Sequence, residues 1–263
     1  MISVTILTKN SAKYLREVLQ ALQFFDEVLV FDNGSSDCTL DIAKEFSNVT
    51  LLTGSFDGFG PTHNKASSLA KHDWILSIDS DEVVTPEMAK EILSTDLSED
   101  SVYSFPRHNY FNGRWIRWCG WYPDRQTRLY NRARTRFTDA QVHEAVITEG
   151  MKQVRLNSPL VHYSYEKISD FLNKMQSYSS LFAIQNCGKK SSSPLKAIAH
   201  GSFAFFKSYI IKRGILGGYE GFVISAYNGH TAFYKYLKLY EANQAKKTRI
   251  FTTEITEDSK FNH

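Results

Sequence analysis

The sequence contains few cysteines, and they lie far apart. Cys38, Cys119 and Cys187 are the only three among 263 residues, and no CxxC pair occurs. Zinc sites and disulfide frameworks need clustered or regularly spaced cysteines, so neither is predicted. A reducing cytosol is the expected location. The start of the chain agrees, because an apolar run begins at Ile2 without the basic segment and cleavage site of a signal peptide.

Long apolar runs and a strong net charge are also absent. No uninterrupted apolar stretch reaches the roughly 18 to 20 residues that span a bilayer, and the best candidate, residues 202–211, is interrupted by Lys207. The formal net charge of +3 is too small to predict a nucleic-acid-binding protein. However, the segment between Asp170 and Glu220 has no acidic residue and seven basic ones. We expect a basic face there, on a protein that touches a membrane without crossing it.

The first hundred residues alternate between apolar strand-like runs and helical segments. We predict strands at residues 2–7, 27–31, 49–52 and 74–78. Helices are predicted between them, and the third begins at Pro61 because proline suits the first helical position. Apolar runs without polar alternation fit strands covered on both faces, and β-α-β units give a mainly parallel sheet. The sequence therefore predicts a Rossmann-like α/β fold.

Three polar segments, residues 8–10, 32–37 and 79–82, each follow a strand of this predicted sheet. In open parallel sheets, ligands bind beyond the carboxyl ends of the strands. We therefore expect the three segments to contribute to one site.

Later in the chain the pattern changes twice. Residues 102–163 have the character of short strands rich in aromatic residues and arginine. Helices are then predicted at residues 168–186, 195–212 and 219–244, with a frayed polar tail after Lys246. We predict a catalytic domain at residues 1–165 and a helical C-terminal region at residues 166–263.

The segment "SIDSDE" places Asp79 and Asp81 at the end of a predicted strand. An Asp-x-Asp in this position can hold a hard divalent ion such as Mg²⁺ or Mn²⁺, which then bridges the phosphates of a nucleotide. A solvated acidic turn is the common alternative, since the motif is so short.

Asp32 and Lys65 are further candidates for ligand binding. Asp32 ends a buried strand, and its carboxylate can accept a hydrogen bond from the N–H of a pyrimidine ring. Its neighbours Ser35, Ser36 and Asp37 are also common helix caps. Lys65 would offset the charge of a nucleotide, although an exposed helix residue is the usual role of a lysine.

Together, these segments resemble family 2 glycosyltransferases of the GT-A fold. The likeness rests on "VTILTKN", "VFDNGSSDCT", "NKASSLAKHDWILSIDSDE", "RLYNR" and "VHEAV", which occur in the family's order over about the first 165 residues. It implies transfer of a sugar from a nucleotide donor with inversion at the anomeric carbon. It also implies roles for six residues: Thr8, Asn10 and Asp32 in the base pocket, Lys65 near the nucleotide, Asp79 near the ribose or metal, and Asp81 on the metal.

An inverting transfer needs a base that removes the proton of the acceptor hydroxyl. Glu144 in "VHEAV" is favoured by the resemblance to a bacterial branch of the family, with Asp124 and Asp139 as alternatives. His143 and His162 would orient the base or approach the metal, or simply pack as ordinary strand residues. Two arginines of "PDRQTRLYNR", at positions 125 and 128, suit a phosphate clamp or ion pairs with the acidic cluster, and Arg128 is favoured for the clamp.

The helical region combines apolar and basic residues. Phe203, Phe206 and Ile210 follow one another at helical spacing, and four basic residues lie around them: Lys196, Lys207, Lys212 and Arg213. Such a helix suits the headgroup region of an anionic membrane, or alternatively packing against the catalytic domain.

The whole chain also resembles bacterial glucosyltransferases that extend heptose in the inner core of lipopolysaccharide or lipooligosaccharide. This resemblance implies UDP-glucose as donor, a heptose of the lipid-linked core oligosaccharide as acceptor, and a peripheral location on the inner face of the cytoplasmic membrane. Another UDP-sugar transferase, for example a galactosyltransferase, is the alternative donor assignment. A non-catalytic membrane adaptor with the same fold is an alternative from another class. A sugar nucleotidyltransferase is disfavoured because "LTKNSAKY" has no glycine for a phosphate loop.

Overall fold

A computed structural model describes residues 1–140 and 144–261, with side chains up to residue 248. The chain divides into two compact units. The first comprises Met1–Tyr110 and Pro123–Ser164, and the second comprises Phe111–Tyr122 together with the chain from Tyr165 onward.

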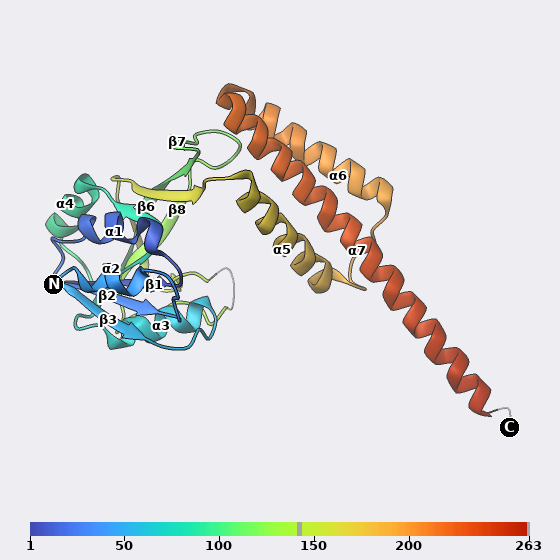
Figure 1. Cartoon of the computed structure of the whole chain (residues 1–263), viewed down its shortest axis with the longest axis horizontal. Helices are drawn as coiled ribbons and strands as arrows, with labels where there is room; N and C mark the ends of the chain where they lie inside the picture. Colours follow the sequence, from blue (N-terminus) through green and yellow to red (C-terminus); the bar gives the residue numbers. More distant parts are fainter. Residues whose placement is uncertain (141–143, 262–263) are drawn as a thin grey trace. The chain divides into compact units, whose positions relative to one another are not determined.

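The first unit contains a mixed sheet whose parallel half comes from the first eighty residues (Figure 1). Its strands pair in the order β3-β2-β1-β4 and are β1 (Ile2–Thr8), β2 (Glu27–Asp32), β3 (Val49–Thr53) and β4 (Trp74–Asp79). All four predicted strands are confirmed, and each ends one residue later than predicted. The register pairs Thr8 with Asp32 and Leu7 with Asp79. The predicted polar segments therefore begin at one edge of the sheet.

Most of the remaining strands join the sheet by antiparallel pairing, whereas the strand at Lys152–Arg155 pairs parallel with Ser101–Ser104. Strand β8 (Arg125–Asn131) pairs antiparallel with β4, and β6 (Ser101–Phe111) pairs antiparallel with β8. The order continues through β10 (Leu160–Tyr165) to β5 (Glu82–Val84), while β7 (Arg114–Trp115) and β9 (Lys152–Arg155) also pair with β6. Since β5 directly follows the acidic motif, this arrangement brings β8, β6 and β10 toward the end of β4.

Helices cover both faces of the parallel strands. One face carries α1 (Ala12–Ala21), α2 (Thr39–Lys44) and α4 (Pro86–Ser94), and the other carries α3 (Phe59–Leu69). Alternate residues of β2 enter the two cores, with Val28 and Val30 in one and Leu29 and Phe31 in the other. This explains why β2 is apolar without alternation.

The predicted start of the third helix is wrong. Helix α3 begins at Phe59, after Gly58 with a φ of 102°, so Pro61 lies in its first turn rather than at its first residue. Proline is tolerated there because the first N–H groups of a helix have no intrahelical acceptor.

The second unit is a set of helices, α5 (Ile168–Asn186), α6 (Pro194–Phe206) and α7 (Gly218–Phe261). Helices α5 and α6 both pack along α7 (Figure 1). A π-helical turn η1 (Lys207–Ile211) and a 3-10 turn η2 (Gly214–Gly217) connect α6 to α7. The predicted helix 168–186 is confirmed, whereas the predicted fraying after Lys246 is wrong, because α7 continues to Phe261.

An aromatic core explains why residues 111–122 belong with the helices. Phe111 and Ile116 pack in one buried cluster with Phe171 of α5 and Ile224 of α7. Tyr165 stacks on Phe171 with ring centroids 4.1 Å apart. None of the helices in the described part of the chain is long and apolar enough to cross a membrane.

Candidate active site

The carboxyl edge of the parallel strands brings the three predicted polar segments together. The backbone N–H of Asn10 donates to Ser35 Oγ at 2.8 Å, which joins the first segment to the second. Ser11 Oγ lies 2.9 Å from Ser80 Oγ, which joins the first segment to the third. Side chains that are far apart in sequence therefore line one edge, where ligands of such sheets bind.

Asp32 is fully buried at this edge and accepts four hydrogen bonds. Its Oδ2 accepts from the backbone N–H groups of Gly34 (2.9 Å) and Ser35 (2.8 Å), and its Oδ1 accepts from the hydroxyls of Thr8 (3.0 Å) and Ser35. Burial raises the pKa of Asp32, but these hydrogen bonds outweigh it, so the pKa lies below its usual value. Asp32 is therefore held as a carboxylate that can only accept hydrogen bonds.

Asn10 orders the same loop from the other side. Its Oδ1 accepts the backbone N–H of Ser36 at 2.8 Å. Its φ of 53° is left-handed, a conformation that asparagine adopts more easily than most residues. Thr8, Asn10 and Asp32, the predicted base pocket, thus belong to one hydrogen-bonded group.

An ion-pair network around a buried arginine lies at the end of β4. Arg128 is almost fully buried, and its Nη2 lies 2.6 Å from Asp79 Oδ2 and 3.3 Å from Glu82 Oε1. Burial lowers the pKa of Arg128, but the charges of Asp79, Glu82 and Glu144 raise it above its usual value. Burial likewise opposes ionisation of Asp79, and Arg128 nevertheless holds the pKa of Asp79 below its usual value. Arg128 therefore pairs with the acidic cluster, one of the two arrangements that the sequence left open.

Asp81 differs from Asp79 in having no guanidinium partner among the described residues. Both side chains are 37% exposed, and Asp81 Oδ2 lies 3.6 Å from His162 Nε2, which is too long for a hydrogen bond. The ring of His162 is held from its other nitrogen, where Nδ1 lies 2.6 Å from Asn109 Oδ1. Asp81 thus offers its carboxylate, with an oriented imidazole nearby, to a ligand from solvent.

The structure distinguishes the three carboxylates considered as the catalytic base. Asp124 accepts from Arg107 Nε at 2.8 Å and Asn109 Nδ2 at 2.9 Å, and Asp139 forms an ion pair with Arg136. Burial raises the pKa of Asp124, but its hydrogen bonds and Arg107 bring it below the usual value. The side-chain hydrogen bond from Arg136 lowers the pKa of Asp139. Both are therefore weak proton acceptors.

Glu144 is half-buried, and its negative charge acts on Arg128. This places it near the same ion-pair network as Asp79 and Glu82. His143, the histidine before it, lies outside the described residues.

Two other predicted cations occupy different surroundings. Lys65 is exposed, and its Nζ lies 5.5 Å from the centroid of the Phe31 ring, next to Asp32 in sequence. The Arg125 Nη2 group instead donates to the backbone carbonyls of Ser104 and Leu156. Arg125 therefore ties strands together and does not point into the acidic cluster.

Sequence reasoning gave no individual role to three residues of this site. Arg107 connects Glu82 Oε1 (3.1 Å) to Asp124, and Glu82 Oε2 accepts the backbone N–H of Asp79 at 3.0 Å. His63 of α3 contacts Ser77 Oγ through Nδ1 at 3.1 Å, and its pKa is lowered to about 4, chiefly by burial. Only Glu82 had a sequence signal, because it immediately follows the Asp-x-Asp.

A divalent ion fits this edge if the nucleotide supplies part of its coordination. Among residues 1–140 and 144–261, no group of three or more His, Cys, Asp or Glu side chains is arranged to hold a metal ion by itself. The site has four formal carboxylates (Asp79, Asp81, Glu82 and Asp124) against two guanidinium groups (Arg107 and Arg128). Mg²⁺ is usually bound by one or two carboxylates together with phosphates and water. Asp81 and the Asp79 beside it provide such a pair.

Comparison with known families identifies the class of protein. A model of glycosyl transferase family 2 matches residues 3–152, more than half of the chain. The chain therefore belongs to glycosyl transferase family 2, and its mixed α/β fold with C-terminal helices is a GT-A fold.

Curated and solved proteins similar to this chain are also glycosyltransferases. The uncharacterised glycosyltransferase RT0209 of Rickettsia typhi is 30% identical over 273 residues, covering 95% of this chain and 90% of that protein. The lipopolysaccharide core biosynthesis glycosyltransferase LpsC of Rhizobium meliloti is 21% identical over 258 residues, covering 93% and 94%. The structure of Staphylococcus aureus TarS residues 1–349 in complex with UDP matches with a TM-score of 0.48 and 17% identity, covering 94% and 91%.

Proposed function

We propose that this protein is an inverting glycosyltransferase that moves a sugar from a UDP-sugar to a hydroxyl of a lipid-linked oligosaccharide. One observation carries the proposal. The buried Arg128 pairs with Asp79 and leaves Asp81 without a guanidinium partner among the described residues, at the sheet edge where Asp32 also lies and with Glu144 near the same network. One edge of the sheet thus carries the groups that the reaction needs. Asp32 can accept the N–H of the nucleobase, Asp79 and Asp81 can hold an ion on the phosphates, and Glu144 can accept a proton.

Nucleotide binding is assigned to the hydrogen-bonded group around Asp32. Its carboxylate would accept the ring N–H of uracil, and Thr8 and Asn10 would shape the base pocket. Because all four acceptor positions of Asp32 are occupied, the Ser35 hydroxyl would turn away when the base binds. Lys65 would lie close enough to offset nucleotide charge.

Asp81, together with Asp79, is assigned to hold Mg²⁺ or Mn²⁺. Such an ion, when bound, would neutralise charge on the departing diphosphate. Arg128 is a positioning residue in this assignment, because it fixes Asp79 and Glu82 rather than contacting solvent.

Glu144 is assigned as the general base. The acceptor hydroxyl oxygen would bond to the anomeric carbon while the bond from that carbon to the UDP oxygen breaks. The hydroxyl proton would pass to Glu144, and UDP would leave with the bonding electron pair. The paired states of Asp124 and Asp139 support this choice, since both have a lowered pKa. General base catalysis contributes roughly 10²- to 10⁴-fold.

The donor is proposed to be UDP-glucose and the acceptor a heptose of the lipopolysaccharide or lipooligosaccharide inner core. The sequence resemblance supports this, as does the similarity to a protein named for lipopolysaccharide core biosynthesis. UDP-galactose is the alternative donor, because glucose and galactose differ at one hydroxyl.

We place the protein on the inner face of the cytoplasmic membrane, as a peripheral protein. Phe203 and Phe206 of α6 are 59% and 50% exposed, and Ile210 of η1 is also exposed. Two exposed lysines flank the two phenylalanines, Lys196 before them and Lys207 directly after them. Exposed aromatic and basic residues on one helix suit an anionic lipid surface.

The test of the reaction is acceptor-dependent release of UDP from UDP-glucose and UDP-galactose with added Mn²⁺. Asp81→Asn is expected to reduce the rate at least about 10²-fold, and Glu144→Gln roughly 10²- to 10⁴-fold with UDP binding preserved. The exposed carboxylates Asp96 and Glu87 provide matched controls as Asp96→Asn and Glu87→Gln. Full activity of Asp81→Asn would remove the metal assignment, and full activity of Glu144→Gln would remove the base assignment.

A further inference from the structure

A basic pocket lies between α6, η1 and α7 of the helical unit. Its volume is about 400 Å³, far above the roughly 30 Å³ that one water occupies in the liquid. Three lysines line it: Lys207 at the start of η1, Lys212 directly after η1, and Lys235 of α7. The Lys212 carbonyl accepts the backbone N–H of Cys119 at 2.9 Å, which fixes the chain at the pocket wall.

No carboxylate balances these charges. The lining contains no Asp or Glu, and none of the three lysines forms an ion pair with a residue in the described part of the chain. Like charges gathered around one cavity repel one another. An anion between them would turn that repulsion into attraction.

The remaining wall supplies neutral hydrogen-bonding groups. Asn228 Nδ2 donates to Ser208 Oγ at 3.0 Å, and the same amide carries a second N–H. Thr231 also lines the pocket, is 9% exposed, and has a buried hydroxyl without a partner among the described residues. Ammonium and amide groups are donors that bind phosphate oxygens, whereas the Thr231 hydroxyl is enclosed in the wall.

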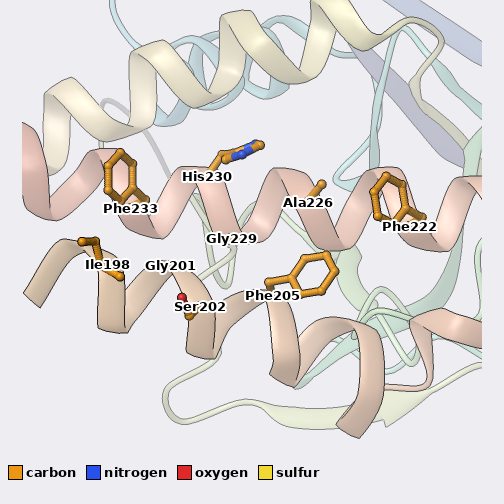
Figure 2. Close-up of a pocket in the computed structure, with 9 residues that line it drawn as sticks. All are labelled: Ile198, Gly201, Ser202, Phe205, Phe222, Ala226, Gly229, His230 and Phe233. Atoms are coloured by element: carbon orange, nitrogen blue, oxygen red, sulfur yellow. The ribbon is translucent and has the colours of Figure 1, made fainter. Parts of the chain in front are cut away.

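The opposite side of the α6–α7 pair is apolar. Figure 2 shows the groove there, with Gly201 and Gly229 where the helices approach and the rings of Phe205, Phe222 and Phe233 along it. Phe233 and Lys235 are two residues apart, or about 200° around a helix, so they project to opposite sides of α7. The two helices therefore separate an apolar groove from a basic pocket.

We propose that the basic pocket of Lys207, Lys212 and Lys235 binds a phosphate group. This pocket contains none of the residues assigned to the nucleotide, so a negative result here would leave the proposed transfer reaction standing. The phosphate belongs either to a lipid headgroup or to a water-soluble phosphate compound, and both present the same dianionic or monoanionic oxygens to the lysines.

The experiment measures binding of two probes to the full chain by titration calorimetry. One probe is inorganic phosphate, and the other is dihexanoyl phosphatidic acid below its micelle concentration. The pocket variant carries Lys207→Gln, Lys212→Gln and Lys235→Gln. The control variant carries Lys189→Gln, Lys190→Gln and Lys247→Gln, which removes the same charge from exposed positions of the same unit.

The pocket variant is expected to bind at least one probe at least 10-fold more weakly than the wild type, and the control less than twofold more weakly. Binding of both probes would indicate that any phosphate enters, and binding of phosphatidic acid alone would indicate a lipid headgroup; both support the site. A third variant with arginine at the three pocket positions should keep the affinity, which separates loss of charge from loss of fold. Equal weakening in the pocket and control variants, or no binding of either probe, would overturn the proposal.

Discussion

Two arginines form ion pairs with the acidic residues at the sheet edge. Arg128 holds Asp79 and Glu82, and Arg107 holds Glu82 and Asp124, so three of the four carboxylates have a guanidinium partner. Removing one partner of a buried ion pair typically costs about 3 to 5 kcal/mol, because an unpaired charge stays buried. Asp81 is the one carboxylate of the four without a guanidinium partner among the described residues.

His63 should make the stability of the first unit depend on pH. Its pKa falls from the ordinary 6.5 to about 4 on folding, chiefly through burial. Between these values the unfolded chain binds more protons than the folded one, so the free energy of unfolding should decrease as pH falls from 6.5 to 4. The full effect is about 3 kcal/mol, and stability should be constant in this respect above pH 6.5. Urea unfolding at several pH values measures it.

His63→Gln should remove most of the pH dependence of the free energy of unfolding between pH 4 and 6.5. His72→Gln, at a half-buried position of the same unit, should keep this dependence. An unchanged slope in His63→Gln would show that other groups produce the dependence.

At this scale the sequence predicted the residues at strand ends, left the pairing of Arg128 with them as one of two possibilities, and gave no role to Arg107. Asp32, Asp79 and Asp81 follow from the rule that ligands bind beyond the carboxyl ends of parallel strands. The partners Arg107 and Arg128 come from β6 and β8, and their meeting depends on the antiparallel order of those strands. A single sequence does not specify that order, because each strand alone would fit several positions.

Small residues shape the contact between α6 and α7. The buried positions of α6 are Ala197 and Gly201, while its large apolar side chains are exposed except for the half-buried Phe205. A Cβ on Gly201 would lie 2.9 Å from Phe233 Cβ and 3.1 Å from the Gly229 carbonyl oxygen. The two backbones therefore approach closely only because these positions lack side chains.

Gly201→Val is expected to destabilise the helical unit by about 1 to 3 kcal/mol, because the added methyl groups force the helices apart. Ala199→Val on the exposed part of α6 is the matched control and should cost less than about 1 kcal/mol, the helix-propensity difference. Thermal unfolding followed by circular dichroism compares the two. Equal losses would mean that the close approach contributes nothing.

Secondary-structure elements were predicted best where a strand is buried on both faces, because its sequence is then a continuous apolar run. The four parallel strands are short apolar runs between turn signals, and their limits agree within one residue. The start of α3 was missed because Gly58, rather than the proline, sets the turn before it. The predicted helix 195–212 ends its α-helical part at Phe206, where η1 changes the hydrogen-bond spacing. Hydrophobic periodicity does not distinguish α- from π-helical turns over five residues.

For the molecule as a whole, membrane attachment is the decisive property to test. The full chain should sediment with vesicles containing anionic phospholipid and remain in solution with purely zwitterionic vesicles, because each basic residue near an anionic surface contributes about 1 kcal/mol. The double variant Phe203→Ser and Phe206→Ser should lower the partition coefficient at least 10-fold, since apolar burial is lost.

The matched control is Phe24→Ser with Phe56→Ser, which removes two exposed rings from the first unit. If the α6 variant bound vesicles as well as the wild type does, or if both variants lost binding equally, Phe203 and Phe206 would not be the attachment site.

The sheet edge also has a thermodynamic consequence. Four carboxylates face two guanidinium groups there, so a diphosphate approaching alone meets a surplus of like charge. A bound cation would neutralise part of this negative charge, and the diphosphate would supply additional oxygen ligands to the cation. Linkage then requires each to raise the affinity of the other by the same factor, whichever arrives first. The concentration of divalent cation would therefore set how much of the nucleotide-sugar donor stays bound between turnovers.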